Sequence, residues 1–219
     1  MVETPQTLPG ITSPTSHVTT LHGVSWETYI RLLDEVGDYR TYRMTYYNRI
    51  LEIVMPSEVH EIITRLIDWI LYTLCEEIGL NLKTIGSTTL KVEKLSSSPE
   101  PDNGYYIQNE PLVRGRTIDL TQDPPPDLVV EVNISYTNID KKAMYQDMKV
   151  PEFWSYDGKT QQTSFYVLSS GAYQKLANSA TFPFIQQGTI ATFIKQCEQA
   201  GEMPAKRQFH AWVQQQTRA

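Results

Sequence analysis

The chain has 219 residues, of which 40% are hydrophobic, and a net charge of −6 at pH 7. This length suits one domain with a substantial core and is too short for two domains of ordinary size. The acidic balance lacks the broad positive field of most nucleic-acid-binding proteins, which argues against a simple DNA-coating protein. Cys75 and Cys197 provide neither a disulfide framework nor a zinc spacing, so we expect a cytoplasmic protein.

The first 22 residues are rich in Thr, Ser and Pro and show no periodicity, which predicts a flexible tail. They lack the basic-then-apolar order of a signal peptide, and no apolar run approaches the roughly 20 residues of a membrane span. We therefore expect a tail over residues 1–22, a single domain over residues 23–219, and no membrane partner.

Two helices are predicted early in the domain. Ser25 is a typical N-cap for a helix over Trp26–Val36, and Gly37 ends it. Ser57 caps a longer helix, in which apolar residues recur at helical spacing until Gly79. The long apolar stripe predicts that this second helix packs across a sheet.

The remaining elements are shorter. Runs rich in β-branched and aromatic residues predict strands over Thr41–Tyr46, Ile50–Met55, Leu82–Ile85, Thr88–Val92, Phe153–Tyr156 and Thr163–Leu168. Tight hairpin turns are predicted at Asn48-Arg49 and Asp157-Gly158, and a turn-rich connector over Ser96–Pro101. Further helices are predicted over Asp140–Met148, Ile190–Gln199 and Pro204–Gln214.

The run Pro125–Asn133 has the pattern of a short strand that is buried on both faces, except that it contains Glu131. Side chains alternate along a strand, so Asp127, Val129, Glu131 and Asn133 share one face. A buried ionised carboxylate costs several kcal/mol unless it is paired, hydrogen-bonded or bound to a metal. Glu131 therefore needs a partner, and Asp127, roughly 13 Å away along the strand, is too distant to share one ion with it.

The order of these elements resembles the nuclease superfamily named for a Pro-Asp and then (Asp/Glu)-x-Lys pattern, and more closely the Uma-two family of restriction-endonuclease-like proteins. The residues that carry the resemblance are Ser25-Trp26-Glu27-x-Tyr29, Leu51-Glu52-Ile53-x-Met55-Pro56, Glu58-x-His60-Glu61, Glu100-Pro101-Asp102 with Tyr106-Ile107-Gln108-Asn109, Asp127–Val132, Asp140-Lys141 with Tyr145, and Val150-Pro151-Glu152-x-Trp154. The resemblance spans roughly residues 23 to 170. It implies an α/β (α+β) fold with a restriction-endonuclease-like core, in which a central mixed β-sheet is flanked by helices.

The resemblance also implies that Asp102 and Glu131, with 28 residues between them, are the two metal-binding carboxylates. Oxygen ligands on neighbouring strands suit Mg²⁺ or Mn²⁺, which would hold a phosphate oxygen and activate a water for phosphodiester hydrolysis. We expect the two carboxylates within about 6 Å of each other. Two alternatives stay open: Asp102 could form a turn with Asn103-Gly104, and Glu131 could belong to a structural salt bridge.

The chain departs from the superfamily pattern at Asn133, where a lysine would orient the attacking water. In many members of the family that lysine has moved to the following helix, and Lys141 occupies the matching place; Lys142 is the less favoured neighbour. A solvated surface lysine is the alternative reading of Lys141.

The long helix adds two further candidates at its start. Glu61 resembles the helix-borne acid that completes this kind of site, and His60 precedes it; Glu58 is a fallback. An acid in a first helical turn can also merely complement the helix dipole.

A second literal match to the pattern exists. Pro126-Asp127 is followed by Asp157-Gly158-Lys159, but Asp-Gly between two β-rich runs predicts an exposed turn. We therefore treat Asp127 as a residue of the strand entry and only a secondary site candidate.

Two functions follow from these patterns. The first is a metal-dependent nuclease that acts on DNA, which we expect to be a homodimer because a duplex has two strands to cut. The alternative is a catalytically degraded nuclease-fold protein that serves as a binding or scaffolding module, which the acidic charge and Asn133 favour.

Overall fold

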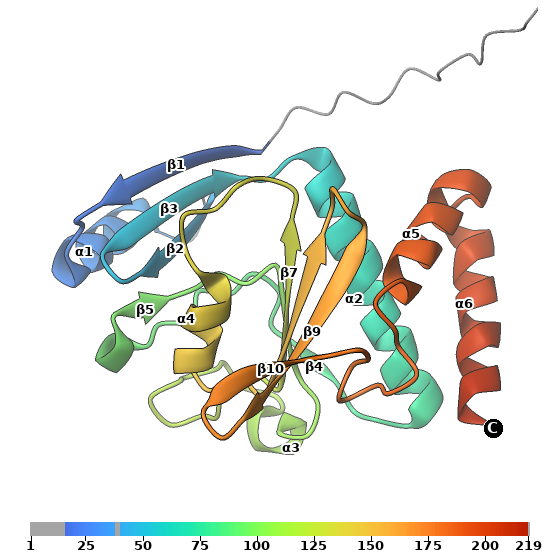
Figure 1. The fold of residues 1–219 in the computed structure, drawn as a ribbon. Coiled ribbons are helices and arrows are strands. Elements are labelled where there is room, and N and C mark those ends of the chain that lie inside the picture. The colour runs from blue at the N-terminus through green and yellow to red at the C-terminus, as the bar shows by residue number, and fades with distance from the viewer. Residues whose placement is uncertain (1–15, 38–39, 219) are drawn as a thin grey trace, which may run out of the picture.

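The computed structural model describes residues 16–37 and 40–218, which form two β-sheets and the helices around them (Figure 1). The larger sheet has the strand order β10-β9-β8-β7-β6-β4, and the smaller one has the order β1-β3-β2-β5. The strands of the larger sheet are β4 (Lys83–Thr84), β6 (Asn103–Tyr106), β7 (Leu128–Asn133), β8 (Glu152–Asp157), β9 (Gln162–Ser169) and β10 (Ala172–Leu176). Those of the smaller sheet are β1 (His17–His22), β2 (Arg43–Tyr47), β3 (Ile50–Met55) and β5 (Ser97–Ser98).

The helices are α1 (Trp26–Val36), α2 (Glu58–Ile78), α3 (Glu110–Val113), α4 (Lys141–Asp147), α5 (Thr189–Ala200) and α6 (Glu202–Thr217), with a 3-10 turn, η1, over Glu93–Leu95. In the larger sheet β7 runs parallel to β8, whereas the other neighbouring strands are antiparallel. The sheet is therefore mixed and flanked by helices, which confirms the predicted fold class.

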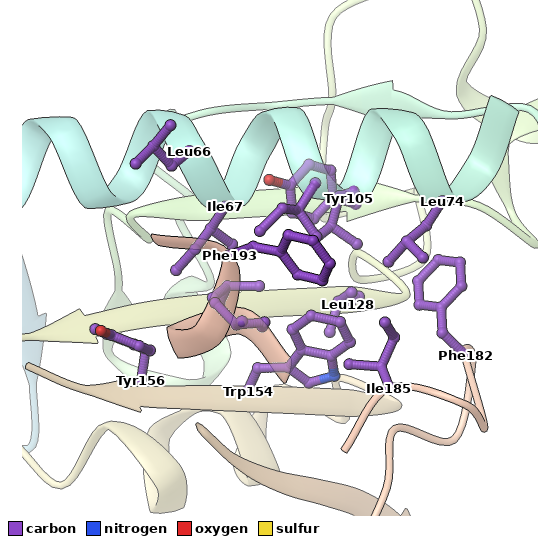
Figure 2. Packing of buried hydrophobic residues seen from close by; sticks show 14 of the residues in the cluster. Leu66, Ile67, Leu74, Tyr105, Leu128, Trp154, Tyr156, Phe182, Ile185 and Phe193 are labelled. Carbon is purple, nitrogen blue, oxygen red and sulfur yellow. The ribbon is translucent and has the colours of Figure 1, made fainter. Parts of the chain in front are cut away.

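Helix α2 covers one face of the larger sheet, as its apolar stripe predicts (Figure 2). The Ser57 hydroxyl caps the helix by accepting from the His60 N–H at 3.3 Å, and Gly79 ends it in the left-handed conformation at φ 72°. Its buried side chains pack against Val130 on β7 and Trp154 on β8. Burial of this apolar face is the main local source of stability for the helix.

The opposite face of the larger sheet is covered by α4. Met144 and Tyr145 of this helix pack with Val129 and Phe153 in a second buried cluster. A third cluster joins α1 to the smaller sheet. The central strand β7 thus lies between two apolar layers, and only its ends reach the boundary of the core.

Several predicted elements are confirmed. The first helix has the predicted bounds, and Ser25 accepts a hydrogen bond from the Thr28 N–H. Asn48 and Arg49 both have positive φ, as a tight hairpin between β2 and β3 requires. The strands around Asp157-Gly158, the helix after Asp140 and the two C-terminal helices also form.

Two predictions about local structure were wrong. Residues 17–22 form β1 and pair with β3, so the part of the predicted tail from residue 16 onward is ordered structure; residues 1–15 lie outside the described residues. Alternation in His17–His22 is weak because β1 pairs with one neighbour and exposes much of its surface. Of Thr88–Val92, only Val92 makes a bridge, to Ser97, because this segment forms an irregular loop around η1.

No sequence pattern predicts β5, β10 or α3, which are short or mainly exposed. Among the described residues, no helix has the length and apolar character needed to cross a membrane.

Glu152, at the start of β8, is a buried carboxylate with a structural role. Its oxygens accept from the Trp154 indole at 2.6 Å and from the Ser179 hydroxyl at 2.7 Å. They also accept from the N–H groups of Ala180 and Thr181 and from the Thr181 hydroxyl. The carboxylate therefore links residues 179–181, which precede α5, to the start of β8.

We expect Glu152→Gln to lower the free energy of unfolding by about 3 kcal/mol, because an amide NH₂ group would face donors that need an acceptor. Chemical denaturation measures this loss. The exposed Glu198→Gln on α5 is the control and should change stability by less than about 0.5 kcal/mol. Equal stability of the two variants would contradict the structural role of Glu152.

Candidate active site

Asp102 and Glu131 lie at the same edge of the larger sheet, on neighbouring strands. Asp102 immediately precedes β6, and Glu131 lies in β7, with side chains that are almost inaccessible to solvent. The register pairs Asn103 with Val130, so its extension by one residue places Asp102 opposite Glu131. Asp102 Oδ2 also accepts from the Val132 N–H at 2.7 Å. The two acids therefore meet on adjacent strands.

Glu131 is held by two side chains of α4. Lys141 forms an ion pair with Glu131 Oε2, and the Tyr145 hydroxyl donates to Oε1. Residues four apart share one face of a helix, which is why both side chains reach the same carboxylate. Asp140 caps α4 by accepting from the Ala143 N–H at 2.9 Å and so fixes where the helix begins.

Asp102 is held by basic side chains from two other elements. Arg43 of β2 forms an ion pair with Asp102 Oδ1, and His60 Nε2 of α2 lies 3.1 Å from the same oxygen. The second guanidinium nitrogen of Arg43 donates to Glu61 Oε1 at 2.7 Å. Glu61 is partly exposed, so it forms the rim of the site, and His60 lies deeper and contacts Asp102 directly.

The pKa values of the two acids are shifted in opposite directions. Burial raises the pKa of Glu131, as does the charge of Asp102, and Lys141 opposes this only in part. Burial would also raise the pKa of Asp102, but the hydrogen bond from His60 and the charges of Lys141 and Arg43 hold it well below its usual range. Neighbouring carboxylates with divergent pKa values are typical of sites that carry out acid–base chemistry.

The pKa values of the two basic partners follow from the same contacts. Burial lowers the pKa of His60, yet its hydrogen bond to Asp102 and that carboxylate's charge leave the pKa above the ordinary value. Burial likewise acts against the charged form of Lys141, but the charges of Glu131 and Asp102 outweigh it and raise the pKa of Lys141. Lys141 is therefore a charged group of the site at neutral pH.

Asp102 borders a small cavity of about 50 Å³ between the smaller sheet and the segment after β7. Arg43, His60, Asp102 and Lys141 line it, and so does Val18 of β1. A second, open groove of about 990 Å³ adjoins this cavity and shares Arg43, Pro56 and Glu100 with it.

The chain is similar to known proteins over most of its length. The model of the Uma2 family, described as "Putative restriction endonuclease", matches residues 26–189. The chain belongs to the Uma2 family. This match includes every residue that contacts Asp102 or Glu131 through a side chain, and it leaves out β1 and α6.

A crystal structure described as a putative nuclease belonging to DUF820 from Anabaena variabilis ATCC 29413 resembles this Uma2 protein with a TM-score of 0.51. The sequences are 12% identical, and the match covers 77% of this chain and 97% of the other. This likeness supports the shared fold. No curated protein matches the chain.

The structure separates the secondary candidates of this Uma2 protein. Asn133 lines the cavity and donates from its side-chain amide to the Ser155 hydroxyl at 2.9 Å. Asp127 lies at the other end of β7, where it accepts from the N–H groups of Ile107 and Asn109. Asp157 caps its own hairpin by accepting from the Lys159 N–H at 2.8 Å. The geometry thus keeps Asn133 beside the acids and gives the two aspartates structural contacts.

Sequence reasoning assigned no role to Arg43 or Tyr145. Arg43 alternates with Thr45 on β2, whereas Met44 and Tyr46 face α1, so the alternation does indicate a polar face. It does not reveal which acid that face meets. Tyr145, four residues after Lys141, carried part of the family resemblance, and its spacing could have indicated a shared partner.

The described residues contain no group of three or more His, Cys, Asp or Glu side chains that could hold a metal ion by themselves. Mg²⁺ keeps several waters and often uses one or two carboxylates, so Asp102 and Glu131 have the chemical type of ligand that such an ion takes. Each of their four oxygens already has a protein partner, which the ion would have to share or displace. Glu61 is joined to Asp102 through Arg43, and Glu52 and Glu100 line the same cavity as Asp102.

We expect Asp102→Asn to destabilise the protein by about 2–3 kcal/mol at pH 7 and by progressively less as the pH falls below about 4. The folded protein keeps Asp102 ionised below its ordinary pKa of about 3.9, so the carboxylate stabilises the fold above that pH and loses this effect as the pH falls. Denaturation of both proteins at several pH values measures the difference.

Asp34→Asn, at an exposed position of α1, controls for loss of one carboxylate and should show a small difference throughout. If the effect of Asp102→Asn stayed constant between pH 7 and pH 3, the low pKa of Asp102 would be refuted.

Proposed function

We propose that this protein is a metal-dependent nuclease that hydrolyses phosphodiester bonds of DNA. The observation that carries the proposal is the meeting of Asp102, Glu131 and Lys141 at one sheet edge, although they come from three different elements. Membership in a family described as "Putative restriction endonuclease" supports the same chemistry. The groove beside the site offers a path for an extended substrate.

Asp102 and Glu131 would hold Mg²⁺ or Mn²⁺, because both ions prefer oxygen ligands. A bound ion of this kind supplies positive charge to the phosphate and lowers the pKa of water.

The chain's own residues would position the reactants. Tyr145 donates to one oxygen of Glu131, and the other oxygen holds the Lys141 ammonium. The orientation of Lys141 is thereby fixed at the cavity, where it would direct the attacking water and stabilise negative charge on the phosphate. Hydrolysis joins the water oxygen to phosphorus and breaks one P–O ester bond, which leaves a phosphomonoester and a hydroxyl group.

The direct test is cleavage of plasmid and single-stranded DNA with Mg²⁺ or Mn²⁺, beside Glu131→Ala and a sample with a chelator. We expect cleavage that the chelator abolishes and that Glu131→Ala lowers by about 10²-fold or more. DNA binding without cleavage by the parent protein would favour the degraded binding module instead. Equal cleavage by the parent protein and Glu131→Ala would exclude this site.

Lys141→Ala tests the cation. We expect it to slow cleavage by about 10²-fold, because a positioned charged group typically contributes this much. Asn133→Lys in the same background should recover part of the activity, since residue 133 shares the face of Glu131 and lines the cavity.

The matched control is Lys142→Ala. Lys142 is the next residue on α4, but its ammonium lies over the Tyr166 ring, 5.3 Å from the centroid, and points away from Glu131. It should keep near-parental cleavage. Equal losses in the Lys141 and Lys142 variants would show that α4 contributes only general positive charge.

A further inference from the structure

Arg43 occupies a position between two acids and two cavities. Its guanidinium contacts Asp102 Oδ1 through one nitrogen and Glu61 Oε1 through the other. The side chain lines both the small cavity at the acids and the large open groove beside it. It is 16% exposed, so the guanidinium lies at the boundary between the enclosed site and the groove.

The contacts at Asp102 leave little room for a further positive charge. Oδ1 accepts from Arg43 and lies 3.1 Å from His60 Nε2, and Oδ2 accepts from the Val132 N–H. A carboxylate oxygen has about two lone-pair sites, so Oδ1 is fully occupied. A divalent cation at Asp102 would also meet the guanidinium at contact distance, where repulsion between like charges is strong in a buried site.

If Arg43 is displaced from Asp102, its guanidinium can still bind Glu61 and extend into the groove. Glu61 is partly exposed and would still hold one nitrogen as a pivot at the rim. The groove that this side chain already lines carries two further cations, Arg40, which is paired with Glu100, and Lys91. Hydroxyl groups of Ser87 and Thr88 line it as well. A planar guanidinium binds phosphate oxygens in pairs, so Arg43 would be suited to the backbone of a nucleic acid in this groove.

We propose that Arg43 is an exchangeable counter-ion: a divalent metal displaces it from Asp102, and the freed guanidinium binds a phosphate of the nucleic-acid strand in the groove. This inference rests on the proposed function for the identity of its ligands. It assigns Arg43 a positioning role that links metal binding to substrate binding. A merely structural arginine would neutralise Asp102 and remain in place.

The first measurement needs no activity. Mn²⁺ binding to Arg43→Gln is compared with the parent protein by electron paramagnetic resonance, without nucleic acid. We expect tighter binding in the variant, on the order of tenfold, because the competing charge is gone. Arg43→Lys retains the charge and should stay near the parent value.

The second measurement is binding of a fluorescent single-stranded oligonucleotide with Mn²⁺, in the Lys141→Ala background, where cleavage is slow. Arg43→Gln should bind more weakly, and the slope of log affinity against log salt should fall by about 1, as expected for one lost phosphate contact. Arg207→Gln removes the same charge from an exposed position on α6, which lines neither the small cavity nor the groove, and should leave both affinities unchanged.

A measurement on the parent protein covers the case in which Arg43→Gln fails to fold. Phenylglyoxal labelling, mapped by mass spectrometry, should modify Arg43 faster with Mn²⁺ than without it, and the oligonucleotide should then protect it. Reactivity that Mn²⁺ leaves unchanged would overturn the exchange.

The outcomes distinguish a failure of the Arg43 exchange from a failure of the proposed hydrolysis. Tighter Mn²⁺ binding together with weaker oligonucleotide binding supports the exchange, and weaker binding of both ligands, or tighter Mn²⁺ binding with unchanged oligonucleotide binding, overturns it. If the parent protein cleaves no nucleic acid but both affinities shift in opposite directions, the exchange stands and the proposed hydrolysis fails.

Discussion

The apposition of Asp102 and Glu131 is the constraint that the surrounding structure satisfies. Two carboxylates at one buried sheet edge repel each other and lose hydration, which costs several kcal/mol unless counter-charges are present. The partners come from three separate elements: β2 supplies the charge of Arg43, α4 supplies the charge of Lys141, and α2 supplies His60, whose Nε2 lies 3.1 Å from Asp102 Oδ1. The acid pair thus ties the smaller sheet and two helices to the edge of the larger sheet.

Four of the buried acids differ in the groups that hold them. Asp127 and Glu152 accept mainly or partly from backbone N–H groups, which hold fixed positions in the fold. Glu131 is held by side chains, and Asp102 shares its two oxygens between side chains and one backbone N–H. Side-chain partners can rotate away without unfolding the chain, so a carboxylate held by them can change partners. All four acids are buried, so burial by itself does not separate the candidate site from the structural acids.

The sequence predicts local structure well where a short signal decides it. Ser57 and Gly79 bound α2, and the aliphatic run around Glu131 predicts the buried strand, because caps and periodicity act over a few residues. The contact between Arg43 and Asp102 depends on how the smaller sheet packs against the larger one, and no local pattern encodes it. The strand at residues 17–22 was not predicted for the same reason, because its partner, β3, lies some 30 residues further along the chain.

The hydrogen bonds of Asp127 have a consequence for the chain between the two acids. Residues 107–127 leave the sheet after β6 and return at β7, and Asp127 joins the two ends of this excursion by accepting from the N–H groups of Ile107 and Asn109. The pairing of β6 with β7 then sets the position of Asp102 relative to Glu131. This position does not depend on the length of the segment between Asn109 and Asp127. Insertions or deletions in the excursion can therefore accumulate without moving the acids, because longer loops add little closure entropy. The number of residues between the two carboxylates is free to drift, and a search for relatives that fixes this spacing would overlook proteins with the same site.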